Sequence, residues 1–391
     1  MKLFVAVLVS CWLAGCATPA AGPKGPSGER FFNDRLFAPA SERIRASDVF
    51  ALSDEMRRYL NEDIAEQALG KGRQQALIDA LFTHGELRLE YDSELTRNAA
   101  QAFTARSGNC LSLVIMTAAF ARALDLPIEY AKVFVDESWA RAGDIYLSIG
   151  HVNVTLGRRL AEDKFGARRI IAAQREDGAV TVDFLPPRDA RAVRSRPIRE
   201  SIVVGMFMNN RAVEALTRGR TDDAYWWARE SIVQAPELVT AYNTLGATYA
   251  RKGALREAEV AYRHVLTVEP NNALALSNLV PVLEGLGRSE EARQLAARRD
   301  RVDPEPPFSQ FHRGLAALQS GDVRAAKEAF AREVARDPYY HEFQYWLGVA
   351  LLRNGDVEQA RRHLALAMEY STTRQDRELY SGKLARIAAP R

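Results

Sequence analysis

The sequence predicts an α+β domain followed by an all-α solenoid of helical hairpins. Three observations predict this: a length of 391 residues, which exceeds one typical core; helix patterns followed by strand patterns over residues 31–200; and a 34-residue period over residues 205–374. The net charge of +3, from 53 basic and 50 acidic residues, is too balanced to attract nucleic acid. We therefore expect a globular protein without a nucleic-acid partner.

Residues 1–15 predict a removable export signal. Lys2 supplies a positive charge, and Leu3 to Leu13 supply an apolar stretch that is too short to span a bilayer. The stretch ends in Leu13-Ala14-Gly15-Cys16, which resembles the bacterial lipobox and implies that Cys16 becomes the lipidated N-terminus. An ordinary secretory signal with an incidental cysteine is the alternative.

The residues after Cys16 predict how the protein is placed in the cell. Ala17 stands where an inner-membrane retention signal would have Asp, so the resemblance implies the outer membrane of a host with two membranes, with the protein facing the periplasm. Residues 16–30 are rich in Ala, Gly and Pro and predict a flexible tether. Farther along, no run of about 18 apolar residues occurs, so the lipid is the expected membrane contact.

Small residues recur every 34 positions in the C-terminal half. The recurrent residues are Gly219, Gly253, Gly287, Gly321 and Gly355; Ala224, Ala258, Ala292, Ala326 and Ala360; and Pro236, Pro270, Pro304 and Pro338. Glycine permits a tight turn between antiparallel helices, alanine lets the helices approach closely, and proline ends the second helix. Five hairpins are therefore predicted over residues 205–374, with a capping helix over residues 375–391.

The second of these units resembles the tetratricopeptide repeat (TPR). The resemblance is carried by Leu245-Gly246, Tyr249, Ala258, Tyr262 and Pro270. It implies a concave groove that binds a protein or peptide partner. Residues at or near groove positions are Asn209, Asn243, Asn278, Tyr345 and Trp346. The alternative is that these side chains are simply solvated.

A helix N-terminus marks the candidate nucleophile. Amphipathic helices are predicted over Asp48 to Glu66 and Lys71 to Phe82, before a Gly-Asn turn that precedes Cys110 and a long apolar helix. Unpaired amide hydrogens and the helix dipole at such a position stabilise a thiolate. Because Cys11 leaves with the signal and Cys16 is acylated, Cys110 is the expected free thiol of the mature chain.

A thiolate nucleophile needs a base, and the base needs an orienting group. His151 opens His-Val-Asn-Val-Thr-Leu, which alternates as an edge strand with one buried face should, and Asp183 lies in another short strand from Val180. Four of the six histidines lie in the repeats, and His84 lies in a His-Gly turn. His151 and Asp183 are therefore the predicted partners of Cys110.

These residues resemble the transglutaminase-like superfamily of the papain-like thiol fold. The resemblance is carried by Gly108-Asn109-Cys110-Leu111-Ser112-Leu113, Trp139, His151-Val-Asn-Val154 and Asp183-Phe184. It implies that Cys110 is the nucleophile, His151 the general base and acid, and Asp183 the group that orients the imidazole. The predicted fold class is thus an α+β papain/transglutaminase-like domain followed by an all-α TPR solenoid.

The sequence departs from the family at the oxyanion site. No Trp lies between Trp12 and Trp139, where animal transglutaminases place an oxyanion donor. The Cys110 amide can supply one donor, and Gln101 or Asn109 is the candidate for a second. Nothing resembles a calcium loop or a metal cluster, so no metal or cofactor is expected.

A Cys-His-Asp site implies acyl transfer from an amide or ester, with water or an amine as acceptor. The predicted function is a lipid-anchored envelope protein that acts on proteins or peptides, with the repeats docking the substrate or a partner. A catalytically silent scaffolding lipoprotein and a structural role in an envelope machine are the alternatives. Because Glu200 to Met208 leave almost no linker, the first repeat is expected to pack directly on the catalytic domain.

Overall fold

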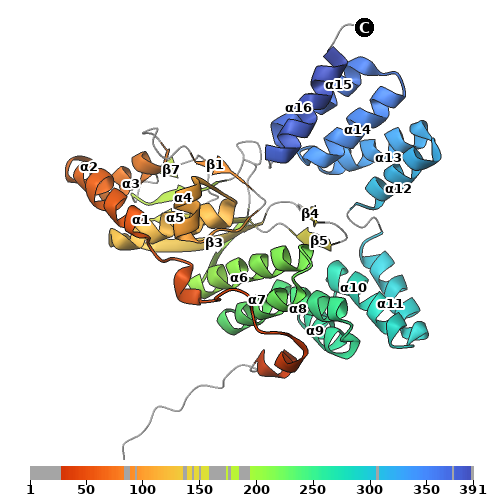
Figure 1. Cartoon of the computed structure of the whole chain (residues 1–391), viewed down its shortest axis with the longest axis horizontal. Coiled ribbons are helices and arrows are strands. Elements are labelled where there is room, and N and C mark those ends of the chain that lie inside the picture. The colour runs from red at the N-terminus through yellow and green to blue at the C-terminus, as the bar shows by residue number, and fades with distance from the viewer. Residues whose placement is uncertain are drawn as a thin grey trace, which may run out of the picture.

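A computed structural model describes residues 28–82, 89–92, 95–134, 139–142, 145–148, 151–157, 173–174, 178–184, 194–304, 308–371 and 374–388. Helices and a small sheet come first, and an array of helical hairpins follows (Figure 1). Across these ranges no helix is both long and apolar enough to cross a membrane. The predicted signal, Cys16 and residues 17–27 of the predicted tether lie outside the described residues.

Helices precede the sheet in the N-terminal domain (residues 54–198), as the sequence predicts. They are α1 (Asp54–Tyr59), a π-helical turn (Leu60–Ile64), α2 (Ala65–Lys71), α3 (Arg73–Phe82), α4 (Ala99–Ala105) and α5 (Cys110–Ala123). The first helix begins at Asp54 and not at Asp48, because the Ser53 hydroxyl caps it by accepting from the Met56 N–H at 3.2 Å. Gly72, with a φ of +84°, separates α2 from α3.

An antiparallel sheet of five strands in the order β7-β8-β6-β3-β9 packs beside α5. Its strands are β3 (Ile128–Phe134), β6 (His151–Leu156), β7 (Ala173–Gln174), β8 (Val180–Val182) and β9 (Arg194–Ile198). Two short pairs complete the strands: β1 (Glu90–Tyr91) with β2 (Ser107–Gly108), and β4 (Trp139–Ala142) with β5 (Ile145–Ser148).

The strand that carries His151 lies inside the sheet. β6 pairs with β3 on one side and β8 on the other, and five of its six side chains are buried. The sequence predicted an edge strand with one buried face, and that prediction is wrong. The alternation in His-Val-Asn-Val-Thr-Leu is interrupted, because His151 and Thr155 are buried as well as the apolar residues.

An N-terminal strap, residues 31–48, contacts the repeats through its residues 31–42. Phe37 stacks on Tyr225 with ring centroids 3.9 Å apart, and Phe31 packs edge-on against Tyr242 at 5.0 Å. The strap is also bonded to the repeats, since the Tyr225 hydroxyl donates to Asp34 at 2.5 Å. These residues were assigned by sequence to the domain that carries Cys110, but the structure places them across α7, α8 and α9 (Figure 1).

Five helical hairpins follow the domain, at the predicted period. Their helices are α6 (Glu200–Thr217), α7 (Thr221–Gln234), α8 (Val239–Lys252), α9 (Leu255–Val268), α10 (Ala273–Gly285), α11 (Ser289–Val302), α12 (Ser309–Ser320), α13 (Val323–Arg336), α14 (His341–Arg353) and α15 (Val357–Tyr370), with α16 (Arg374–Ala388) as the cap. The five periodic glycines all have φ between +74° and +88°, and the five periodic alanines are each 1% exposed or less. Both predicted roles are confirmed.

The buried side chains fall into two large cores. One joins the N-terminal domain, the strap and helices α6–α11, and the other lies within α12–α15. In Figure 1 the module α12–α16 (blue) stands apart from α6–α11. In α11, which the structure describes throughout, only Ala292 is buried. Ala296 and Arg299 stand where the second repeat has Tyr262 and Val265, so α11 offers little apolar surface to a following hairpin.

Candidate functional site

Cys110 is the first residue of α5, as predicted. The preceding Asn109 has extended backbone angles, and its Oδ1 caps the helix by accepting from the Ser112 N–H at 2.9 Å. Gly108 is required at this turn, because a Cβ there would lie 2.6 Å from the Ser112 Cβ. Cys110 is 6% exposed, and its backbone N–H belongs to the first turn of α5.

The turn before Cys110 is held from a second direction by the β1–β2 pair. Tyr91 lies opposite Gly108 in parallel register, and the Asp92 N–H donates to the Gly108 carbonyl at 3.1 Å. Arg97 in turn binds the Asp92 carboxylate at 2.7 Å. The position of the thiol is therefore fixed by both its helix and a neighbouring strand.

His151 and Asp183 meet across two paired strands. His151 is the first residue of β6, Asp183 follows the last residue of β8, and β6 and β8 pair through Val154 and Val182. The His151 Nε2 lies 2.6 Å from the Asp183 Oδ1. The sheet thus brings together the two residues that sequence order paired.

Cys110 also acts on His151, since it raises the pKa of the imidazole. Since Asp183 occupies Nε2, Nδ1 is the ring nitrogen available to the thiol. Burial lowers the pKa of His151, but Asp183 and Cys110 outweigh burial and raise it to about 10. The imidazole is therefore protonated at neutral pH when it faces a thiolate.

Tyr91 is a residue of this site that sequence reasoning missed. Burial, the charge of Cys110 and the charge of Asp92 all raise the pKa of its phenol, so the hydroxyl stays protonated near the thiol. Its side chain is nevertheless 39% exposed. The available signal in the sequence was a short run of alternating charged and apolar residues that ends at Tyr91. Nothing in that run points to Cys110.

The two candidates for a second oxyanion donor both cap helices. Gln101 forms a capping box with Asn98: Gln101 Oε1 accepts from the Asn98 N–H at 3.1 Å. The Asn109 amide nitrogen donates to the Thr96 hydroxyl at 2.9 Å. Their oxyanion role stays a prediction, as does the role of Trp139, whose side chain lies outside the described residues. Among the residues described, no cluster of three or more potential metal ligands occurs.

Comparison with known proteins identifies part of the chain. A model of the tetratricopeptide repeat family matches residues 311–371, and a second such model matches residues 239–272. The C-terminal half contains TPR repeats. The matched ranges cover the helices of repeats 2 and 5 and most of repeat 4, and leave out repeats 1 and 3. No curated protein matches this chain.

Solved structures resemble the chain over less than half its length. A TPR protein of the thermophile Thermus thermophilus is 19% identical, covers 46% of this chain and 99% of its own, and gives a TM-score of 0.30. YrrB, described as a TPR protein with an unusual peptide-binding site, is 20% identical over 46% of this chain and 92% of its own, with a TM-score of 0.25. PilF of Pseudomonas aeruginosa is 20% identical, covers 47% of this chain and 83% of its own, and gives a TM-score of 0.28.

The predicted groove residues of the TPR array differ in their surroundings. Asn209 and Asn243 recur at the same register in α6 and α8, and the Oδ1 atom of each is buried without a hydrogen-bond partner in the described part of the chain. Asn278 is half-buried in α10. Tyr345 stacks on Tyr380 of the capping helix at 4.8 Å, and Trp346 stacks on Phe330 at 6.1 Å. Partner binding by these five residues stays a prediction.

The first TPR repeat packs directly on the N-terminal domain, as the short connection predicts. Glu200, at the start of α6, pairs with Arg122 of α5 and accepts from the Tyr130 hydroxyl of β3 at 3.2 Å. Farther along α6, Glu214 accepts from the Thr96 N–H at 2.6 Å. No sequence pattern indicates this last contact, because its partners are 118 residues apart.

Proposed function

We propose that this protein transfers acyl groups from, or hydrolyses, amide bonds of proteins or peptides at Cys110, with its TPR array docking the substrate or a partner. The observation that carries the proposal is the position of His151, whose Nε2 lies 2.6 Å from the Asp183 Oδ1 and whose pKa is raised by both Asp183 and Cys110. A buried imidazole held between a carboxylate and a thiol at a helix N-terminus supports nucleophilic thiol chemistry.

The reaction follows from these groups. The Cys110 thiolate attacks the carbonyl carbon, a C–S bond forms, and the carbonyl electron pair moves to oxygen. The tetrahedral intermediate collapses as the C–N bond breaks, and His151 gives its proton to the leaving amine. Water or a second amine then attacks the thioester, His151 takes the proton from this nucleophile, and the C–S bond breaks to restore the thiolate.

Asp183 and the backbone have supporting roles. The Asp183 carboxylate accepts from His151 and keeps Nδ1 directed at sulfur. The Cys110 N–H, at the first turn of α5, is one donor for the oxyanion, and Gln101 or Asn109 is the proposed second donor. Water as acceptor makes the protein a hydrolase, and an amine makes it a transglutaminase-like enzyme.

Alkylation of Cys110 tests the thiol–imidazole pair. Iodoacetamide reactivity is measured against pH for the soluble chain without its first 16 residues, as wild type and as His151→Ala. We expect rapid reaction below the value of about 8.5 at which a free cysteine ionises, and loss of this reactivity in His151→Ala. A thiol that reacts like a free cysteine in both proteins would overturn the proposal.

A catalytically silent scaffold is the second candidate, and one observation favours it. Cys110 is 6% exposed and His151 is 4% exposed, so both are nearly inaccessible in this conformation. In that case the TPR repeats carry the function and Cys110 is a small core residue. Cys110→Ala would then leave partner capture by the full-length protein unchanged, whereas an enzyme would lose turnover of the captured protein.

We also propose that the protein is exported and lipid-anchored through Cys16, in an outer membrane and facing the periplasm. The support is the Leu13-Ala14-Gly15-Cys16 sequence with Ala17 after it. Metabolic labelling with a fatty acid should mark the wild type and not Cys16→Ala, and fractionation should release Cys16→Ala from the membrane. A labelled Cys16→Ala protein would contradict the anchor.

A further inference from the structure

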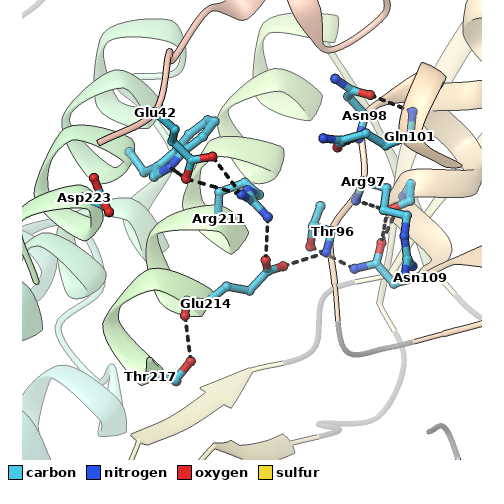
Figure 2. A network of polar contacts seen from close by, with 12 residues as sticks. Glu42, Thr96, Arg97, Asn98, Gln101, Asn109, Arg211, Glu214, Thr217 and Asp223 are labelled. Atoms are coloured by element: carbon cyan, nitrogen blue, oxygen red, sulfur yellow. Dashed lines mark hydrogen bonds and ion pairs between the residues drawn. The ribbon is translucent and has the colours of Figure 1, made fainter. Parts of the chain in front are cut away.

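A chain of polar contacts joins the first TPR repeat to the turn that carries Cys110 (Figure 2). Its central residue is Glu214 of α6, whose Oε1 accepts from the backbone N–H of Thr96 at 2.6 Å. Thr96 is 2% exposed, and the Glu214 side chain is 14% exposed. A short bond between a carboxylate and a buried amide is a strong positional constraint, because the amide has no water to replace it.

Thr96 passes this constraint to the residue before the nucleophile. The Thr96 hydroxyl accepts from the Asn109 side chain at 2.9 Å, and the Asn109 Oδ1 accepts from the Ser112 N–H and hydroxyl at 2.9 and 2.8 Å. The Ser112 hydroxyl also accepts from the Arg97 N–H at 2.8 Å. Each contact fixes the first turn of α5, where Cys110 is the first residue.

On its other side Glu214 is held by the repeat and the strap. Arg211 donates to the Glu214 Oε2 at 3.0 Å and to the strap residue Glu42 at 3.2 Å. Figure 2 shows these contacts as one connected series. Trp227 of α7 donates to Glu42 at 3.0 Å. Burial raises the pKa of Glu214, while the Thr96 N–H and Arg211 favour its charged form. The charged form of Glu214 therefore depends on both the Thr96 N–H and Arg211.

We infer that Glu214 is a positioning residue for Cys110, so that the first TPR repeat is part of the scaffold of the site as well as a docking element. The inference rests on the proposed function in that it assigns Cys110 as the nucleophile. It makes thiol reactivity depend on a residue of α6 that lies outside the N-terminal domain and touches neither Cys110 nor His151.

The chain offers a matched control for Glu214. Asp223 of α7 is a second carboxylate of repeat 1 and is buried; it accepts from the Ser41 N–H at 2.7 Å and pairs with Arg220 at 3.3 Å. Both residues therefore join a backbone amide of a distant segment to an arginine of the repeat. Glu214 leads to Asn109 directly through Thr96, whereas Asp223 reaches Glu214 only through Arg220, Glu42 and Arg211.

The test compares wild type, Glu214→Ala, Glu214→Gln and Asp223→Ala in the soluble chain without its first 16 residues. The rate of Cys110 alkylation is measured against pH, and thermal unfolding is recorded beside it. We expect Glu214→Ala to slow alkylation at neutral pH about tenfold and shift the pH profile toward that of a free thiol. Glu214→Gln keeps an acceptor for the Thr96 N–H and should restore most of the rate. Asp223→Ala should lower stability and leave the profile unchanged.

Hydrogen exchange at residues 109–113 separates this inference from the proposed function. Glu214→Ala should speed exchange there, whether or not the wild-type thiol is activated, and Asp223→Ala should not. A wild-type thiol that reacts like free cysteine would overturn the proposed function alone. Unchanged exchange and an unchanged profile in a folded Glu214→Ala protein would overturn the positioning role, as would an Asp223→Ala protein that alters both as strongly.

Discussion

The first three TPR repeats and the last two are built from the same helical hairpin but belong to different cores. Helices α6–α11 share one core with the N-terminal domain and the strap, whereas α12–α15 bury Phe308, Phe311, Phe330 and Phe343 in a core of their own. The division falls after α11, whose exposed side is polar. The comparison teaches that the repeats of one solenoid can divide between a core shared with another domain and a core of their own. Ala296 and Arg299, at two positions of the second helix of repeat 3, mark the division.

Truncation tests this division with the largest expected effect. A chain that ends at Asp303, just after α11, should stay folded and keep its Cys110 reactivity, because no core residue of the first three repeats lies beyond that point in the described sequence. A chain that ends at Arg199, just after β9, loses Val203, Phe207 and every other repeat residue of the shared core. It should not fold, since the loss exceeds the total stability of about 5–15 kcal/mol.

Circular dichroism and thermal unfolding of the two truncated chains measure the outcome. A cooperative, soluble chain ending at Arg199 would show that the N-terminal domain is independent of the repeats. Loss of folding in the chain ending at Asp303 would show that the terminal module supports the rest. Either result would contradict the division into one shared core and one separate core.

Matched core substitutions give the next effect. Tyr262 in repeat 2 and Phe330 in repeat 4 occupy the same register, and each packs against a glycine of the preceding helix, Gly246 and Gly314. Truncation of either residue to Ala should cost about 3–5 kcal/mol, because both rings are fully buried. Calorimetry should resolve two transitions, and Phe330→Ala should lower only that of the terminal module. A single transition that both variants lower equally would show one cooperative unit.

His151 and the two histidines of the terminal module should contribute to stability in opposite directions as the pH changes. The pKa of His151 is raised to about 10, so its contribution to stability is fully present below pH about 6.5 and is lost as the pH rises through about 10. Burial lowers the pKa of His341 and of His363 in the terminal module, so that module loses stability as the pH falls below about 6.5.

Unfolding of wild type and His151→Gln across pH 5–10 isolates the first contribution. The difference in unfolding free energy should be on the order of a few kcal/mol at low pH and should shrink toward pH 10. His363→Gln in the terminal module serves as the control, since it removes a histidine whose pKa is shifted in the opposite direction. A difference that grows with pH for His151→Gln would contradict an imidazolium held by Asp183 and Cys110.

The parts of the fold that sequence predicted are those set by local rules. The turn glycines at 34-residue spacing, the Gly-Asn turn before α5 and the order of Cys110, His151 and Asp183 can all be read within short windows. The interior place of β6 could not, because Val-Asn-Val reads like an alternating edge strand, while the strands that pair with its two edges, β3 and β8, come from separate segments.

Long-range contacts explain the other differences between the sequence predictions and the structure. Phe37 meets Tyr225 and Thr96 meets Glu214 only after the repeats have packed, and no periodicity records such pairs. The division after repeat 3 could be read in Ala296 and Arg299, but Gly287, Ala292 and Pro304 keep the period and hide it. A repeat period thus predicts the hairpin, and the residues between the periodic positions decide which hairpins join.

Turn glycines provide the smallest and cleanest comparison. Gly253 in repeat 2 and Gly355 in repeat 5 have φ of +81° and +88°, and no atom lies within 4 Å of an added Cβ at either position. Gly253→Ala and Gly355→Ala should each cost about 1–2 kcal/mol through backbone strain alone, and each should lower only the transition of its own module. Gly382 is equally open but helical in α16, so Gly382→Ala should stabilise the terminal module by about 0.5–1 kcal/mol. Equal shifts of both transitions by Gly355→Ala would mean that the solenoid passes strain across α11, and the terminal module would then be continuous with the scaffold of Cys110.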